Sequence, residues 1–214
     1  MAPLKRARQD WQKEARERHI LDSAAALFTA SGRLPAMSEV AERAGLAKGT
    51  LYLYFRGREA LWLELLNGCF ERWVAAILDV LADRPALDGA AVARAIIDSA
   101  GVDPMLIPLS TYNATLIEPN AGPVEADRFK ATTADLIRTL GQFLAPRLGL
   151  AEPDATRRVL LSYAMLLGLW QVATPVPPIR SEKERLAAPG FWTLDWKREA
   201  GLGLTALWTA PAHG

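Results

Sequence analysis

Apolar residues recur along most of the chain at intervals of three and four positions, the spacing that aligns side chains on one face of an α-helix. The sustained alternation of apolar and polar residues that is typical of β-strands is nearly absent. The pattern therefore predicts an all-α protein. The predicted helices cover residues 11–31, 37–44, 48–55, 58–82, 89–100, 104–118, 123–147, 154–173 and 191–209.

The segment that begins "REALWLELLNGCFERW" is predicted to form one long helix, which ends before Pro85. The apolar residues expected on its buried face are Leu61, Leu65, Phe70, Trp73, Ile77 and Leu81. By contrast, the proline-rich and charged stretch "TPVPPIRSEKERLAAPG", residues 174–190, is predicted to be a long loop.

Two of the short predicted helices have the spacing of a helix-turn-helix. Helices 37–44 and 48–55 are joined by three residues that begin with Gly45, and a tight turn there needs a residue that tolerates positive φ. At 100° per residue, Leu51 and Phe55 point the same way and should anchor the second helix to the core. Gly49 and Leu53 then point outward. In a helix-turn-helix this outward side enters the major groove of DNA.

The start of the second helix has side chains that suit a nucleic acid. Lys48 lies where free backbone amides already favour a phosphate. Gly49 would let the backbone approach a groove wall closely, and Thr50 could donate a hydrogen bond to a phosphate or a base edge.

Three larger side chains follow at positions 52–54. Tyr52 and Tyr54 can donate phenolic hydrogen bonds to phosphates, and Leu53 can contact a thymine methyl group. Ordinary explanations stay open for each of them, because both tyrosines could be core or interface aromatics and Leu53 could simply be an exposed leucine.

The net charge of +1 conceals an asymmetry. Residues 1–58 contain 11 Lys or Arg and 6 Asp or Glu, a net charge of +5, while the remaining residues contain 14 and 18, a net charge of −4. This difference suggests that only the first part binds a polyanion, although chance clustering of surface charge would give the same result. The N-terminal arm contributes Lys5, Arg6, Arg8 and Lys13. We expect it to be disordered alone and to lie along the minor groove or the backbone of bound DNA, unless it is merely a solvated tail.

The stretch "ILDSAAALFTASGRLPAMSEVAERAGLAKGTLYLYFRGREALWLELL", residues 20–66, resembles the DNA-binding region of TetR-family transcriptional repressors. The similarity is carried by "ILDSAAALF", by "VAERAGLAKGTLYLYF" and by the "REAL" that opens the long helix. It departs from the family at Pro35-Ala36, where many members have a Thr or Ser helix cap, and at Gly57-Arg58, where Ser or Asn followed by Lys is common.

The resemblance implies a three-helix DNA-binding domain, residues 1–64, joined by the long helix to a larger helical domain, residues 65–214, which binds an effector and dimerises. It also implies which residues meet duplex DNA, with Arg58 on a phosphate. The predicted DNA-binding residues are Lys48, Gly49, Thr50, Tyr52, Leu53, Tyr54 and Arg58.

The rest of the chain is expected to form the homodimer interface and the effector cavity. Helices 154–173 and 191–209, the second with Trp192 and Trp196, carry more apolar residues than one buried stripe needs. Candidate cavity residues are Trp73, Met105, Leu109, Tyr112, Asn113, Leu116 and Trp170. Plain core packing is the alternative for each. Because few of these residues are charged, we expect a small, mostly apolar effector that releases a repressor from a palindromic operator.

Other classes of protein receive little support from the sequence. Cys69 is the only cysteine, and His19 and His213 offer neither a catalytic triad nor a metal-ligand pattern, so we expect no enzyme, cofactor or metal site. A secretory signal and a continuous apolar span are lacking, and the default location is the cytoplasm, on the nucleoid when DNA is bound. A helical adaptor that binds protein through exposed aromatic residues is the remaining rival.

Overall fold

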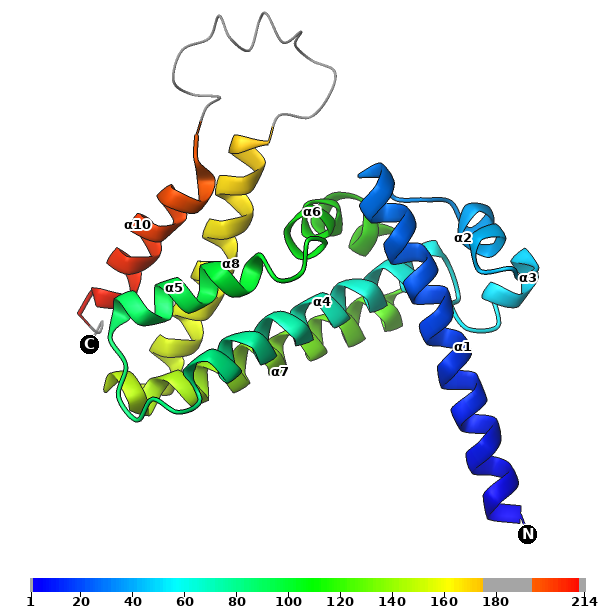
Figure 1. The fold of residues 1–214 in the computed structure, drawn as a ribbon, viewed down its shortest axis with the longest axis horizontal. Coiled ribbons are helices and arrows are strands. Elements are labelled where there is room, and N and C mark those ends of the chain that lie inside the picture. Colours follow the sequence, from blue (N-terminus) through cyan, green and yellow to red (C-terminus); the bar gives the residue numbers. More distant parts are fainter. Residues whose placement is uncertain (1, 175–193, 212–214) are drawn as a thin grey trace, which may run out of the picture. The chain divides into compact units, whose positions relative to one another are not determined.

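The computed structural model describes residues 2–174 and 194–211, which form helices and connecting turns with no strand in these two ranges (Figure 1). The chain divides into two compact units. The first contains Met1–Gly68 and Tyr112–Phe129, and the second contains Cys69–Thr111 and Lys130–Gly214. The all-α fold was predicted correctly. The division at residue 64, which concerns function, stays a prediction.

The first unit is built from helices around a small aromatic core. Its elements are α1 (Ala2–Ser31), α2 (Met37–Arg43), α3 (Lys48–Leu51), the first part of α4 (Arg58–Leu81), the π-helix η1 (Asn113–Ile117), the 3-10 helix η2 (Glu118–Asn120) and the start of α7 (Pro123–Leu148). Phe28 packs against Trp62 and against Tyr112, with ring centroids 5.9 and 6.1 Å apart. The ring of Tyr112 therefore holds the Tyr112–Phe129 segment against α1, a contact that the sequence pattern did not reveal.

Helix α2 has a cap that replaces the usual Ser or Thr. The preceding residue, Ala36, has no side chain that could cap the helix, and its backbone N–H instead donates to Glu39 Oε2 at 2.8 Å. Arg33 forms a two-pronged ion pair with the same carboxylate. The departure at Pro35-Ala36 is thus compensated from within the first turn of α2.

Helix α3 is shorter than the predicted 48–55. Its regular part ends at Leu51, and the chain continues as a tighter turn in which Leu53 N–H donates to Thr50 and Tyr54 N–H donates to Leu51. These bonds span three residues instead of four, which is common where a short helix ends. Phe55 N–H still bonds to Leu51, so the turn keeps the direction of the helix.

The second unit contains the rest of α4 and α7 together with α5 (Gly89–Ala100), most of α6 (Leu106–Tyr112), α8 (Glu152–Ala173) and α10 (Trp196–Thr209). All six residues predicted for the buried face of α4 are buried. The predicted helix 104–118 is helical from Leu106 onward, but α6 ends at Tyr112 and the chain continues as the π-helix and the 3-10 helix. Pro119 is one cause, since it lacks an N–H and disfavours the α conformation of the residue before it.

Two glycines allow helices of the second unit to cross closely. A Cβ atom at Gly89 of α5 would lie 2.7 Å from the backbone of Trp208 in α10, and one at Gly141 of α7 would lie 2.8 Å from the Cα of Thr156 in α8. Backbone atoms cannot move aside as a flexible side chain can. Glycine is therefore required by the packing at both crossings.

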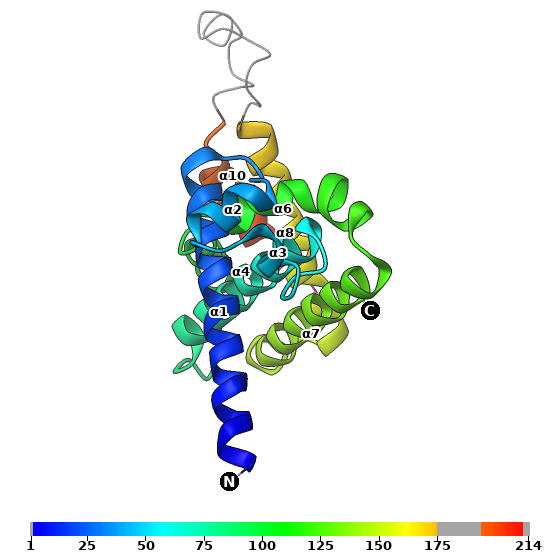
Figure 2. The same ribbon diagram turned by 90° about the vertical axis from the view of Figure 1, so that its right-hand side faces the viewer.

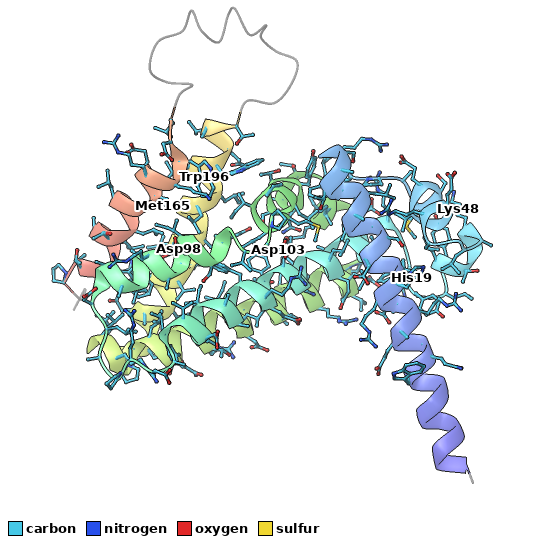
Figure 3. The ribbon with its side chains drawn as sticks, in the orientation of Figure 1. His19, Lys48, Asp98, Asp103, Met165 and Trp196 are labelled. Carbon is cyan, nitrogen blue, oxygen red and sulfur yellow. The ribbon has the colours of Figure 1, made fainter. Side chains whose placement is uncertain are left out.

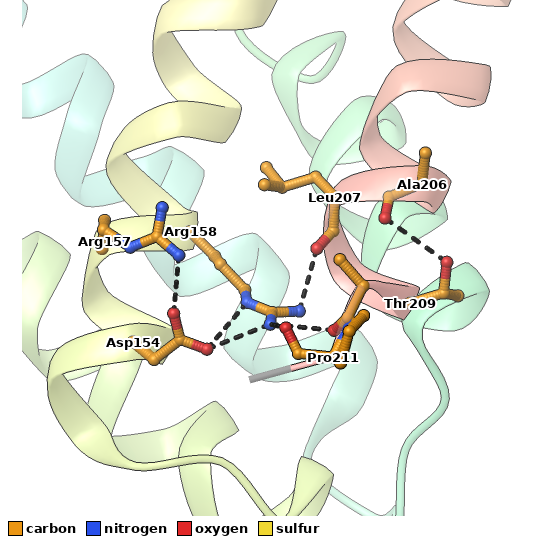
Figure 4. Close-up of polar contacts among 8 residues, drawn as sticks. Asp154, Arg157, Arg158, Ala206, Leu207, Thr209 and Pro211 are labelled. Atoms are coloured by element: carbon orange, nitrogen blue, oxygen red, sulfur yellow. Dashed lines mark hydrogen bonds and ion pairs between the residues drawn. The ribbon is translucent and has the colours of Figure 1, made fainter. Parts of the chain in front are cut away.

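A buried arginine joins α8 to the end of α10. Arg158 is 1 % exposed and donates to the carbonyl oxygens of Leu207, Ala210 and Pro211 at 2.9–3.1 Å, while Asp154 accepts from its Nε at 3.0 Å (Figure 4). The last carbonyls of a helix have no partner within the helix. Arg158 supplies these partners and compensates its own charge with Asp154.

Some sequence predictions lie outside the described residues. These are most of the 174–190 loop, the first residues of helix 191–209 with Trp192, and His213. Among the residues that are described, none of the helices combines the length and hydropathy needed to span a bilayer.

Candidate DNA-binding surface

The turn between α2 and α3 has the backbone geometry that the sequence predicted. Gly45 adopts a φ of 64°, and Leu46 N–H returns to the carbonyl oxygen of Ala41 at 2.9 Å. This pattern ends a helix with a residue in the left-handed conformation, where glycine is least strained. Ala41 and Ala44 are buried, as expected for small residues at a close crossing. Figure 2 shows α2 and α3 together beside α1.

Helix α3 and its turn have one buried side and one open side. Leu51 is fully buried and Phe55 is buried, whereas Leu53 is 79 % exposed and Tyr52 is 47 % exposed. This is the orientation predicted from the helical wheel. Leu53 therefore contributes little to the packing of the unit, although Leu51 and Phe55 on either side of it are buried.

The other predicted contact residues lie around this open side. Lys48 and Gly49 are exposed, and Thr50 is half-buried (Figure 3 labels Lys48). A Cβ atom at Gly49 would meet nothing within 4 Å, so the described fold does not itself require glycine there. Tyr54 is half-buried.

Arg58 and its neighbours are held by ion pairs. Arg58 is partly exposed and pairs with Glu59 at 3.2 Å. Arg56 lies 3.7 Å from Glu125 of α7, and Arg128 of α7 lies 3.4 Å from Glu64 of α4. The two pairs that involve α7 join residues more than 60 positions apart, which local sequence patterns cannot reveal.

The strongest shift of a carboxyl pKa in this unit is that of Glu39. The hydrogen bond from Arg33 is the main cause, the backbone N–H of Ala36 adds to it, and the pKa falls from its usual 4.5 to about 2. Glu39 is therefore ionised throughout the physiological range, and its negative charge is matched by Arg33.

The N-terminal arm differs from its prediction. It is helical, because α1 begins at Ala2 and not near residue 11. Within the first unit, this extra length projects beyond α2 and α3 (Figures 1 and 2). Between α1 and Tyr54 lies an open groove of about 740 Å³, which sequence reasoning missed. Its lining residues are Trp11, Gln12, Lys13, Ala15, Arg16, His19 and Tyr54.

Two family models match the chain over most of its length. The model of the bacterial regulatory proteins of the tetR family matches residues 20–65, and that of the tetracyclin repressor-like C-terminal domain matches residues 68–209. The chain belongs to the TetR family. It is thus a DNA-binding, ligand-responsive transcriptional regulator in the general sense of that family.

Solved structures with the same fold include several TetR-family regulators. One from Streptomyces coelicolor is 21 % identical with a TM-score of 0.56, over 90 % of this chain and 96 % of its own. One from Mesorhizobium loti is 21 % identical with a TM-score of 0.57, over 91 % and 96 %. FadR from Bacillus subtilis, in complex with stearoyl-CoA, is 13 % identical with a TM-score of 0.55, over 90 % and 97 %. No curated protein matches the sequence significantly.

The predicted effector residues of this TetR-family chain are divided between the two units. Trp73, Met105 and Leu109 are buried in the second unit, and Trp170 is half-buried there. The indole N–H of Trp73 donates to the carbonyl of Ile96 at 3.2 Å, so this polar atom is already satisfied.

The remaining three candidates belong to the first unit. Tyr112 and Asn113 are half-buried, and Leu116 is 46 % exposed. Asn113 donates to Glu118 Oε2 at 3.4 Å, whereas its own amide oxygen is buried without a partner in the described structure. The nitrogen of this amide is therefore partnered, and its oxygen is available to a ligand.

Aromatic rings gather beside Trp73 in the second unit. The ring of Tyr163 lies 5.0 Å from that of Phe70 and 6.3 Å from that of Trp73. Burial raises the pKa of Tyr163, and a hydrogen bond with Ser110 partly offsets this. The phenol is therefore neutral and presents a mostly apolar ring.

Cys69 has the environment of a core residue. It is fully buried, and burial is the main cause of a strongly raised pKa, so the thiol stays protonated. The nearby Arg72 is paired with Asp103, its Nε lying 3.0 Å from the carboxylate. Among the side chains that the structure describes, three or more His, Cys, Asp or Glu residues nowhere gather in a way that could hold a metal ion.

Proposed function

We propose that this chain is a homodimeric repressor that binds a palindromic operator and is released by a small, mostly apolar effector. The observation that carries the proposal is the open side of α3, where Leu53 and Tyr52 are exposed above the buried Leu51 and Phe55. We call the exposed side chains of residues 48–54 the reading surface. Such a surface needs a rigid backbone, because a flexible backbone would lose more entropy on binding DNA. It also needs side chains that the rest of the protein leaves uncovered.

Each predicted contact residue has a role in this proposal. Lys48 and Arg58 bind phosphates, and Gly49 allows a close approach of the backbone to the duplex. Thr50 donates a hydrogen bond to a phosphate or a base edge. Tyr52 and Tyr54 donate to phosphates, and Leu53 contacts a thymine methyl group in the major groove.

Exposed apolar residues on the last helices support a homodimer. Leu160, Leu161 and Val172 of α8 and Leu202 of α10 are all exposed, Leu202 by 61 %. Such residues are costly in water when several occur on neighbouring helices. We infer that they contact the same helices of a second copy, because a palindrome has two half-sites and each half-site needs its own helix-turn-helix. We call the unit formed by α1, α2 and α3 the reading head.

The effector is proposed to be mostly apolar because the candidate residues of the second unit are aromatic or aliphatic. Trp73, Met105, Leu109 and Trp170 offer few polar atoms, and the indole of Trp73 is already hydrogen-bonded. The FadR structure with stearoyl-CoA makes acyl chains the first ligands to test. The protein would act in the cytoplasm, without catalytic activity.

Selection of bound duplexes from a random DNA pool tests the proposal most directly. We expect a palindrome whose half-sites are separated by a helical turn or more. Recovery of unrelated sequences would contradict sequence-specific binding and would favour the helical adaptor. A steep loss of affinity with salt is also expected, since neutralised phosphates release counterions.

Sedimentation tests whether the protein is a dimer, and ligand binding tests whether an effector releases it from DNA. Analytical ultracentrifugation at micromolar concentration should give a dimer, and a single 23.4 kDa species would contradict the dimer. A ligand that raises the melting temperature should also weaken operator binding. A ligand that stabilises the protein without releasing DNA would contradict its role as an inducer.

A further inference from the structure

Among the side chains that the structure describes, the charged residues of the groove between α1 and Tyr54 are both positive. Lys13 and Arg16 are its charged lining residues, and the others are polar, aromatic or small. Trp11 adds an indole that is 62 % exposed. A groove that combines cations with exposed aromatic rings suits a polyanion with apolar segments, which describes the sugar–phosphate backbone of DNA.

The charges of this part of α1 are segregated by helical register. Gln12, Arg16 and His19 follow one another at four- and three-residue intervals, which places them on one face. Glu14 and Glu17 lie three residues apart on the other side of the helix, and neither lines the groove. Glu17 instead lines a smaller hollow that also contains Glu64 and Arg128. Glu14 and Glu17 therefore do not offset the positive charges of Lys13 and Arg16 within the groove.

Both walls of the groove are fixed to the helix-turn-helix. His19 Nε2 lies 3.1 Å from the carbonyl oxygen of Ala44, which joins α1 to the end of α2. The opposite wall, Tyr54, belongs to the turn that Leu51 and Phe55 anchor from below. A ligand that enters the groove thus meets preorganised side chains and also meets a residue of the proposed reading surface.

We propose that this groove binds one strand of the operator's sugar–phosphate backbone, with α1 acting as a helix and not as an unfolded arm in the minor groove. Lys13 and Arg16 pair with phosphates, and Trp11 packs on a deoxyribose. Continuity with the proposed DNA-contacting residues, through Tyr54, favours duplex DNA over any other anion. This inference rests on the proposed function and extends the DNA footprint to α1.

Paired substitutions test the proposal on the duplex recovered from the random pool. At about 0.15 M salt, Lys13→Ala and Arg16→Ala should each weaken binding about 5-fold and reduce the salt slope by about 1, because each removes one phosphate contact. Trp11→Ala should weaken binding with an unchanged slope, because an apolar contact releases no counterions. All three positions are exposed, so circular dichroism should show an unchanged helix content.

Arg18→Ala is the matched control. Arg18 is exposed on the same helix and does not line the groove, and its substitution removes the same charge as that of Arg16. It should retain nearly the affinity and slope of the unmodified protein. Equal effects of Arg16→Ala and Arg18→Ala would overturn the groove in favour of a general charge effect, and so would unchanged binding by the groove variants. If the unmodified protein selected no sequence at all, the proposed function itself would fail, which is a separate result.

Discussion

The hydroxyl group of Tyr112 donates a hydrogen bond of 2.9 Å to the carbonyl oxygen of Gly32, 80 positions earlier in the chain. Its ring also packs edge-on against Phe28. This one side chain therefore attaches the end of α6 and the following π-helix to the C-terminal end of α1. Because α1 carries the helix-turn-helix, the contact provides a physical link between the segment 112–129 and the proposed reading head.

Removing only the hydroxyl should have a small effect. Tyr112→Phe is expected to lower the free energy of unfolding by about 1 kcal/mol, since one partly exposed hydrogen bond is lost while the ring contact stays. Tyr112→Ala should cost more, because it also removes the packing on Phe28. Urea unfolding of both variants checks this. Equal losses would show that the packing of the ring contributes nothing, and an unchanged free energy of unfolding in Tyr112→Phe would show the same of the hydroxyl.

Substitution by alanine should affect stability at Leu51 and operator binding at Leu53. Leu51→Ala should destabilise the protein by about 2–5 kcal/mol, because it opens a cavity in the core. Leu53→Ala should change stability by less than about 0.5 kcal/mol and yet weaken operator binding. Thermal unfolding and a gel-shift titration separate the two effects. Normal operator affinity of Leu53→Ala would remove Leu53 from the site.

Lys48→Ala and Tyr52→Phe should weaken operator binding without unfolding the chain. The first is expected to reduce affinity about 5-fold at about 0.15 M salt and the salt slope by about 1. The second removes one hydrogen-bond donor and should reduce affinity about 5- to 10-fold with little change of slope. Unchanged affinity in a gel-shift titration at fixed salt would exclude both residues from the interface.

The buried Arg158 should matter far more than its exposed neighbour. Arg158→Met is expected to lower the free energy of unfolding by about 3–5 kcal/mol, because Asp154 loses a buried partner and the carbonyls at the end of α10 lose their donors. Arg157→Met is the control, since Arg157 pairs with the same carboxylate at 2.7 Å but is 46 % exposed. Its loss should cost less than about 1 kcal/mol. Similar losses in urea unfolding would contradict the role of Arg158 as a helix cap.

Stability in acid should depend on Glu39. Its folded pKa, about 2, lies below the usual 4.5, so its contribution is complete above about pH 4.5 and is lost as the pH falls toward 2. Glu39→Gln removes this titration. The difference in melting temperature between the original protein and the variant should therefore shrink between pH 5 and about 2. A constant difference across this range would show that the charge of Glu39 is not involved.

Local patterns predicted those features that depend on neighbouring residues. The periodicity of apolar residues predicted the all-α fold and the buried face of α4, and the helical wheel predicted which sides of α3 are buried and open. Gly45 marked the turn because positive φ is a property of a single residue. The length of α3 and the change of helix type after Tyr112 were missed, because helices tighten or change type at little local cost.

The sequence by itself determined where helices form and which of their faces are apolar, since both follow from spacing along the chain. Only the tertiary structure decided that Tyr112 contacts α1, that Arg158 caps α10 and that α1 and Tyr54 enclose a basic groove. These features join residues separated by 35 to 80 positions or so, and their energy comes from burial and hydrogen bonds that exist only once the helices have packed.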